Sequence, residues 1–260
     1  MFLYVANWKM EMSFDKAVEF CKDNFDGFIG LSQLESKKVI LCPEFTQLKA
    51  VLDVFGGNGN DIMALGAQDC SEHKPGAYTG QVLAESLGQI GCNYCIVGHS
   101  ERRIYGSETS DQVACKLVRL FECGITPIVC IGESKEDYEN GLAKDVLQEQ
   151  LEPIWEVVKA VITRKGGGKS GKRLSFCIAY EPVWSIGTGI TPENSYIQEI
   201  FNFIVSLAKN NTINAQINLL YGGSVDERKV KSLKLIDNLG GFLLGGASLD
   251  FKKFEKIVQL

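Results

Sequence analysis

Histidine is the rarest residue type in this sequence: only His73 and His99 occur among 260 residues. A metal site built on two or three histidines therefore lacks its ligands. The single Cys-x-x-Cys motif, Cys92 to Cys95, does not replace them, because it has neither a second cysteine pair nor a nearby histidine pair. We expect no metal and no cofactor.

Long apolar runs are also missing, and no stretch approaches the roughly 20 apolar residues that a membrane span needs. No basic segment precedes the first apolar run, which Asn7 and Lys9 interrupt, so we expect no signal peptide. The nine cysteines, an odd number, are scattered through apolar runs. This usage is typical of free thiols in a reducing compartment, and we expect a cytoplasmic protein.

Basic residues do not predominate, since 27 Lys and Arg stand against 32 Asp and Glu, giving a formal net charge of −5. This balance gives no electrostatic reason to expect nucleic acid or an anionic membrane as a partner. An anionic substrate would therefore need a local binding site that attracts it despite the net negative charge of the chain.

Short apolar runs alternate with longer stretches of helical periodicity along the whole chain. Eight such units in this length predict a single (β/α)8 barrel, an α/β fold in one domain spanning residues 1–260. The competing fold, an open doubly wound sheet, would need a glycine-rich turn where Asn7-Trp8-Lys9 follows the first run. The expected strands are 2–6, 38–42, 62–67, 93–97, 125–131, 174–179, 216–220 and 239–244.

Three polar residues stand where amphipathic stretches begin. Ser13 precedes the first, Thr191 the sixth and Ser248 the last, and each is expected to open a helix.

The segment 164–173 is rich in glycine and lysine. It is not a phosphate-binding P-loop, because Thr163 stands where that motif requires glycine and because a strand, not a helix, is expected to follow. We expect a flexible solvated loop.

Polar residues at the carboxyl ends of the expected strands converge on one rim of such a barrel. Asn7 and Lys9 end the first strand, His99 follows the fourth and Glu181 follows the sixth. Each alone could be structural, for example a hydrogen-bonded histidine or half of an ion pair. Together they suit proton abstraction beside a carbonyl, where a carboxylate is the base and neighbouring donors stabilise an enediolate.

Glycines at the ends of the seventh and eighth strands suit a backbone that approaches an anion closely. Their N–H groups could form a phosphate site of the kind found in many barrels. The residues expected to contribute are Gly223, Ser224, Gly245 and Gly246, with Gly187 adding an N–H from the loop after strand six.

Eight motifs in order along nearly the whole chain resemble the triosephosphate isomerase family. They are 6–10, 66–69, 76–80, 98–103, 130–133, 179–189, 221–225 and 245–249. The resemblance implies interconversion of dihydroxyacetone phosphate and glyceraldehyde 3-phosphate, a step of glycolysis and gluconeogenesis.

The resemblance also implies individual roles. Glu181 would be the base, His99 a neutral electrophile, Lys9 the balancing cation and Asn7 an orienting group. Ser100, Glu101 and Glu133 would support them. A mobile lid that excludes water would comprise Pro182, Val183, Trp184, Ser185, Ile186, Gly187, Thr188 and Gly189.

A homodimer is implied as well, through a loop that includes Gln68, Tyr78 and Thr79 and enters the neighbouring subunit. Gln81 stands where the family usually has glutamate, so a charged contact, expected to reach Arg102, becomes neutral. Two other functions stay open: a lyase or synthase on a phosphate-binding barrel, which would need different strand-end residues, and a non-enzymatic interaction protein.

Overall fold

The computed structural model describes residues 1–56, 62–164 and 173–260. Eight parallel strands pair in chain order, and β8 pairs with β1 to close a barrel. This confirms the (β/α)8 fold and excludes the open sheet. The strands are β1 (Phe2–Asn7), β2 (Lys37–Cys42), β3 (Ala64–Ala67), β4 (Cys92–Val97), β5 (Thr126–Ile131), β6 (Ser175–Tyr180), β7 (Gln216–Tyr221) and β8 (Leu239–Leu244).

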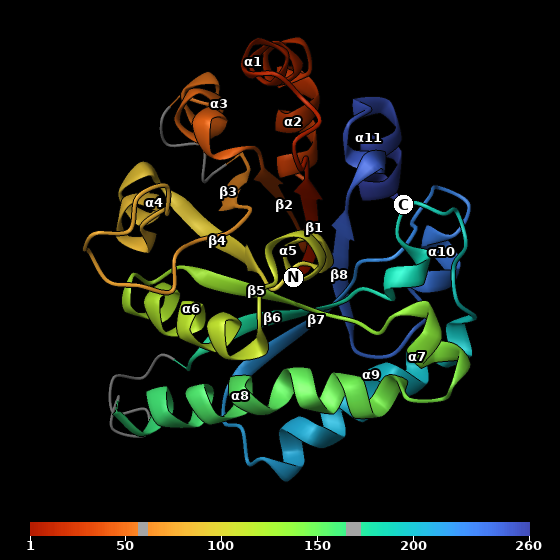
Figure 1. Cartoon of the computed structure of the whole chain (residues 1–260). Coiled ribbons are helices and arrows are strands. Elements are labelled where there is room, and N and C mark those ends of the chain that lie inside the picture. The colour runs from red at the N-terminus through yellow and green to blue at the C-terminus, as the bar shows by residue number, and fades with distance from the viewer. Residues whose placement is uncertain (57–61, 165–172) are drawn as a thin grey trace.

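Helices surround the strands, as Figure 1 shows. The α-helices are α1 (Phe14–Asp23), α2 (Phe25–Ser32), α3 (Leu48–Val54), α4 (Ala84–Ile90), α5 (Ser100–Gly106), α6 (Ser110–Glu122), α7 (Lys135–Glu139), α8 (Ala143–Arg164), α9 (Asn194–Asn210), α10 (Val230–Leu233) and α11 (Phe251–Gln259). Short 3₁₀ helices among the described residues are η1 (Phe45–Gln47), η3 (Val183–Ser185) and η4 (Gly246–Ser248). No described helix is long and apolar enough to cross a membrane.

The buried core has two layers because successive strand residues point to opposite faces. Leu3 and Val5 belong to the cluster that fills the barrel interior, whereas Tyr4 and Ala6 belong to the cluster between strands and helices. Both faces of the sheet are therefore covered, which explains why the strands read as nearly continuous apolar runs.

The helix starts predicted from the sequence are confirmed only in part. The Ser13 hydroxyl accepts the N–H of Lys16 at the start of α1, as expected. Ser248 was expected to open the last helix, and this is wrong. Ser248 ends η4, and α11 begins after Asp250, whose carboxylate accepts the N–H of Lys253. The sixth helical stretch, α9, begins after Glu193, just beyond Thr191.

The glycine- and lysine-rich loop predicted at 164–173 lies outside the described residues except at its ends. Arg164 is the last residue of α8, and Arg173 lies just before β6.

Candidate active site

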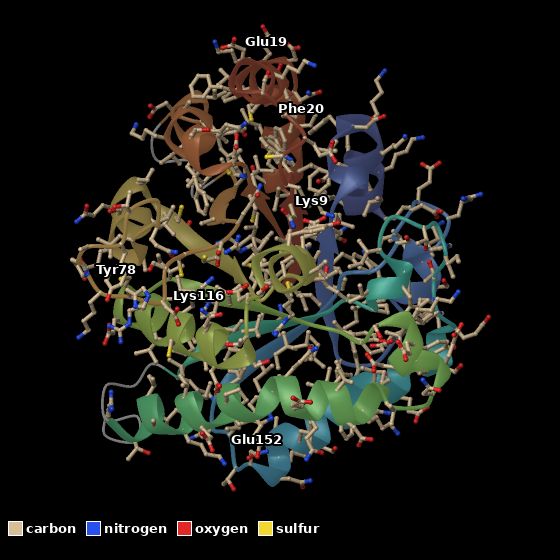
Figure 2. All side chains as sticks on the ribbon, viewed as in Figure 1. Lys9, Glu19, Phe20, Tyr78, Lys116 and Glu152 are labelled. Atoms are coloured by element: carbon tan, nitrogen blue, oxygen red, sulfur yellow. The ribbon has the colours of Figure 1, made fainter. Side chains whose placement is uncertain are left out.

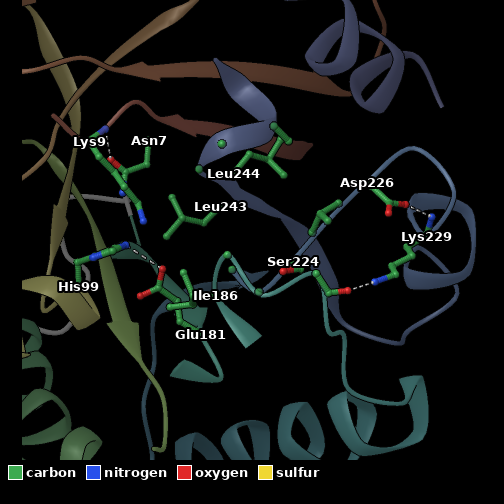
Figure 3. A pocket seen from close by; sticks show the side chains of 18 residues that line it. Asn7, Lys9, His99, Glu181, Ile186, Ser224, Asp226, Lys229, Leu243 and Leu244 are labelled. Atoms are coloured by element: carbon green, nitrogen blue, oxygen red, sulfur yellow. Dashed lines mark hydrogen bonds and ion pairs between the residues drawn. The ribbon is translucent and has the colours of Figure 1, made fainter. Parts of the chain in front are cut away.

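A cavity of about 290 Å³ opens at the carboxyl ends of the strands and brings together residues from five of them. Its size and mixed lining suit a small polar ligand. Figure 3 shows Lys9, His99 and Glu181 on one side of this cavity and Lys229 on the other. The lining residues are Asn7, Lys9, His99, Glu181, Ile186, Gly187, Gly189, Gly222, Gly223, Ser224, Val225, Asp226, Lys229, Leu243, Leu244, Gly245, Gly246 and Ala247.

The backbone at Lys9 has a positive φ of 50°, a conformation that a residue with a Cβ adopts at a cost in energy. Two hydrogen bonds hold it there. The N–H of Lys9 donates to Oδ1 of Asn7 at 3.1 Å, and Nε2 of Gln68 donates to the carbonyl of Lys9 at 2.8 Å. The Lys9 side chain then reaches Glu101, with 2.6 Å between Nζ and Oε1. Lys9 is thus positioned by its backbone as well as by its ion pair.

His99 caps the N-terminus of α5 and is only 5% exposed. Its Nδ1 atom accepts the N–H of Glu101 at 3.2 Å, which requires an unprotonated Nδ1. The ring proton is therefore assigned to Nε2, and Nε2 lies 3.2 Å from Oε1 of Glu181. The Nε2–H of His99, which lines the cavity, is thus a donor held in place at the start of α5.

Opposing influences act on the charge of His99. Burial lowers its pKa, but the Glu181 carboxylate beside Nε2 raises it, and the pKa of His99 is raised on balance in this ligand-free arrangement. The proton affinity of the imidazole consequently depends on where the Glu181 carboxylate lies.

Glu181 follows β6, is 2% exposed, and also receives the N–H of Ser100 at Oε2 at 3.5 Å. Two glycines from neighbouring strand ends make room for it. A Cβ at Gly132 would collide with the Glu181 carbonyl, and a Cβ at Gly222 would press on its side chain. The position of Glu181 therefore depends on two glycines, which a search for charged residues would not identify.

Glu133 anchors the first half of the predicted lid. It is fully buried, and its Oε1 atom accepts Tyr180 Oη at 3.0 Å, Trp184 Nε1 at 2.9 Å and Tyr196 Oη at 3.4 Å. Burial raises the pKa of Glu133, although these hydrogen bonds oppose the rise. Trp184 also stacks on Tyr138, with 4.4 Å between ring centroids.

The second half of the lid is fastened to the loop after β7. Ser185 is buried; its hydroxyl donates to the carbonyl of Ile190 at 2.6 Å, and its carbonyl accepts the hydroxyl of Ser224 at 2.7 Å. Gly187 and Gly189 both have positive φ, which glycine adopts without strain, and both are exposed. The predicted lid is therefore held at Trp184 and Ser185, and an exposed glycine-rich stretch, residues 187–189, follows these contacts.

The structure brings most predicted site residues together. Asn7, Lys9, His99, Glu181, Ile186, Gly187, Gly189 and the four phosphate-site residues after β7 and β8 line the cavity. The predicted supporting residues do not line the cavity but contact residues around it: Ser100 contacts Glu181, Glu101 contacts Lys9, and Glu133 contacts Trp184 of the predicted lid. The remaining lid residues lie outside the lining: Pro182, Val183, Trp184, Ser185 and Thr188.

The predicted dimer loop lies away from the cavity. Tyr78 and Thr79 are exposed, and Figure 2 shows Tyr78 at the edge of the molecule. Gln68 is instead placed beneath the site, where its amide donates to the carbonyls of Lys9 and Cys42. Arg102, the residue that Gln81 was expected to reach from another subunit, pairs with Asp69 of its own chain at 3.0 Å.

Seven of the lining residues were not predicted: Gly222, Val225, Asp226, Lys229, Leu243, Leu244 and Ala247. Gly222 has no chemistry of its own, and only its contact with Glu181 reveals its role. Asp226 and Lys229 lie in a charged segment that resembles ordinary solvated surface. Only the placement of that segment beside the lid could have identified them.

Among the described residues, no group of three or more His, Cys, Asp or Glu could hold a metal ion. All nine cysteines are described and are free thiols. Burial raises the pKa of the Cys130 thiol beside Glu181 well above its ordinary value, and that of Cys21 to about 12. Neither is an activated thiolate in this arrangement.

Comparison with known proteins gives a consistent result. The sequence model of a family described as "Triosephosphate isomerase" matches residues 2–260. A protein named triosephosphate isomerase from Wolbachia sp. subsp. Brugia malayi (strain TRS) is 37% identical over 262 residues, covering 99% of this chain and 97% of that protein. Similar proteins of the same name occur in Aquifex aeolicus (strain VF5), 37% identical with 98% of both chains covered, and Hahella chejuensis (strain KCTC 2396), 34% identical with 99% and 97% covered.

Proposed function

Because the chain belongs to the triosephosphate isomerase family and isomerises triose phosphates, we propose that the cavity is its active site and that Glu181 is the catalytic base. The reaction interconverts dihydroxyacetone phosphate and D-glyceraldehyde 3-phosphate through an enediolate. The observation that carries this proposal is the 3.2 Å contact between Glu181 Oε1 and His99 Nε2 inside a cavity that Lys9 also lines.

Proton transfer follows from these positions. Glu181 removes a proton from the carbon next to the substrate carbonyl, and the electron pair moves onto the carbonyl oxygen. The Nε2–H of His99 and the ammonium of Lys9 stabilise the oxyanion that forms. Glu181 then returns the proton to the adjacent carbon, while a proton moves between the two substrate oxygens, so no metal or cofactor is needed to balance the reaction. Asn7 orients the substrate oxygen and fixes the Lys9 backbone.

Backbone N–H groups hold the substrate phosphate. Gly187, Gly223, Ser224, Gly245 and Gly246 all line the cavity and come from the loops after β6, β7 and β8. Oriented N–H groups bind anions without a formal charge, which reconciles an anionic substrate with a net charge of −5.

The segment Pro182–Gly189 closes over the bound substrate. Trp184 is held by Glu133 and Ser185 by Ser224, and Thr191, just after the segment, also bonds to Ser224, so motion is confined to the exposed residues 187–189 between these contacts. Closure excludes water, which would otherwise allow the enediolate to lose its phosphate.

The functional unit is a homodimer of single-domain subunits in the cytoplasm, working in glycolysis and gluconeogenesis. The loop that carries Tyr78 and Thr79 is exposed yet ordered by its own contacts, since Tyr78 stacks on His73 with 3.9 Å between centroids and Ser71 N–H donates to Val82 across its base. A preordered exposed loop suits insertion into a neighbouring subunit, because little entropy is lost on docking. No nucleic acid or membrane takes part.

A coupled assay tests the proposal. The purified chain receives D-glyceraldehyde 3-phosphate, and α-glycerophosphate dehydrogenase reduces any dihydroxyacetone phosphate formed, with NADH loss recorded. We expect rapid turnover that is insensitive to EDTA and absent in Glu181→Ala. A folded protein that gives no NADH loss would contradict the proposed activity, and full turnover by Glu181→Ala would contradict the proposed base.

A further inference from the structure

The two lysines that line the cavity differ in their partners. Lys9 is paired with a carboxylate, Glu101, at 2.6 Å. The ammonium of Lys229 instead donates to two uncharged oxygens, the Gly189 carbonyl at 3.0 Å and Thr191 Oγ1 at 2.6 Å. Within the described part of the chain, no carboxylate oxygen lies within 4.0 Å of it.

The acidic residues next to Lys229 in the chain are neutralised by other cations. Asp226 Oδ2 accepts Arg228 Nη2 at 2.9 Å, and Glu227 Oε2 lies 3.2 Å from Lys256 Nζ. The Oδ1 atom of Asp226 accepts the backbone N–H groups of Arg228 and Lys229. The charge of Lys229 is therefore the uncompensated one on this side of the cavity.

Hydrogen bonds fix this charge at the cavity wall. Thr191 Oγ1, which contacts the Lys229 ammonium, donates onward to the carbonyl of Ser224 at 2.9 Å. Lys229 thus bridges the C-terminal end of the lid and the loop after β7. Figure 3 shows Ser224 between Lys229 and Glu181, so Lys229 and the proposed base lie on opposite sides of Ser224.

We propose that Lys229 is a specificity-determining residue that attracts the doubly charged phosphate of the substrate to the glycine end of the cavity. The inference rests on the proposed function, because it assigns the phosphate to that end. A net positive charge in a cleft with low-dielectric walls raises the local concentration of anions and their association rate. In a chain of net charge −5, this ammonium is a local positive charge that opposes the sign of the net charge.

The test compares Lys229→Met and Lys229→Arg with Lys231→Met. Lys231 is exposed on α10 and does not line the cavity, so its variant loses the same charge outside the site. At low ionic strength, we expect kcat/KM for D-glyceraldehyde 3-phosphate to fall about tenfold in Lys229→Met, because steering of this size is typical of charged clefts. The loss should shrink as salt is added, since salt screens charges. Lys229→Arg should retain most of the activity, and Lys231→Met should stay within about twofold of wild type.

Two further measurements separate charge from structure. Competitive inhibition by inorganic phosphate should weaken by about the same factor in Lys229→Met, whereas turnover of D-glyceraldehyde, which has no phosphate, should not change. A loss that is equal at all salt concentrations would overturn the proposal in favour of a lid anchor. Equal losses of activity with D-glyceraldehyde 3-phosphate and with D-glyceraldehyde would indicate general damage to the site and would overturn the proposal. An unchanged activity of Lys229→Met would overturn it as well. If the wild-type chain failed to isomerise at all, the proposed function would fail, and phosphate binding alone would still report on Lys229.

Discussion

The carboxylate of Glu181 and the imidazole of His99 lie in direct contact, with 3.2 Å between Oε1 and Nε2, and both side chains are almost completely buried. They come from the ends of two different strands, β6 and β4, and meet only because the barrel closes. The Glu181 carboxylate raises the pKa of His99 against the effect of burial. A substrate that separates the two groups therefore changes the proton affinity of the imidazole.

Replacing Glu181 by alanine should lower kcat by at least roughly 10²–10⁴, the contribution of a positioned base. The coupled NADH assay measures this loss, and circular dichroism checks that the variant folds. Glu152→Ala, on the exposed face of α8, is the control and should behave as wild type. Near-normal turnover by the Glu181 variant would rule out its assignment as the base.

The pKa of His99 should fall in Glu181→Gln. The carboxylate raises this pKa whereas burial lowers it, so burial should prevail when the charge is removed. Nitrogen-15 NMR of the imidazoles during a pH titration measures the change, and only two histidines contribute signals. His73, which does not line the cavity, gives the second signal in the same spectrum. An unchanged or raised pKa for His99 would show that Glu181 does not control it.

Substituting Lys9 by alanine should remove about 2.7–4 kcal/mol of transition-state stabilisation, the scale of a lost oxyanion donor. The ratio of kcat/KM values between wild type and variant gives this quantity directly. Lys49→Ala removes an exposed lysine that is likewise paired with a carboxylate, and should leave kcat/KM unchanged. If Lys9→Ala altered only the free energy of unfolding, Lys9 would be structural.

Glu133→Leu should destabilise the fold by about 1–3 kcal/mol and loosen the lid, because it leaves the buried Tyr180 hydroxyl without its acceptor and releases Trp184. Denaturant unfolding measures the first effect, and tryptophan fluorescence anisotropy reports the second. Glu133→Gln keeps an acceptor at Oε1 and should retain most lid contacts. A leucine variant as stable and as active as wild type would show that this cluster is not an anchor.

The glutamine variant also gives a pH prediction. The folded state raises the pKa of Glu133 above its unfolded value, so the folded state holds this proton more tightly. Stability from this site therefore falls as pH rises from the unfolded value through the raised one. The free energy of unfolding of Glu133→Gln minus that of wild type should consequently increase over the same range.

Thr79→Arg should convert the proposed homodimer into monomers and lower kcat by roughly 10²-fold, because small misplacements of catalytic groups cost that much. Sedimentation equilibrium and the coupled assay measure the two effects. Thr163→Arg, the same change at an exposed site on α8, is the control. A monomeric Thr79 variant with full activity would show that the loop does not support the site. A wild-type protein that sediments as a monomer would contradict the proposed homodimer.

The barrel could be predicted because its strands are buried on both faces, so each is a short apolar run between helical stretches. The third strand was placed two residues early, since Ile62 and Met63 are apolar but precede the pairing that begins at Ala64. The last helix was wrongly predicted to begin at Ser248, because a 3₁₀ turn lies between β8 and α11 and sequence periodicity does not distinguish such a turn.

The site was predictable where side chains carry chemistry at strand ends, as with Lys9, His99 and Glu181. It was not predictable where a residue acts through geometry alone. Gly132 and Gly222 matter because they lack a Cβ next to Glu181, and Lys229 matters because its neighbours leave its charge unopposed. Such properties depend on which loops become neighbours in space.

Closure of the barrel by β8 against β1 has a consequence for how the protein is made. Chains emerge from the ribosome N-terminus first. The pairing partner of Leu3, Gly241, is therefore synthesised long after β1. Until β8 has been made, β1 presents an unpaired edge, a known template for aggregation. Lys9 and the glycines at 245 and 246 meet only after that point, so a chain interrupted before β8 has both an exposed strand edge and an incomplete cavity.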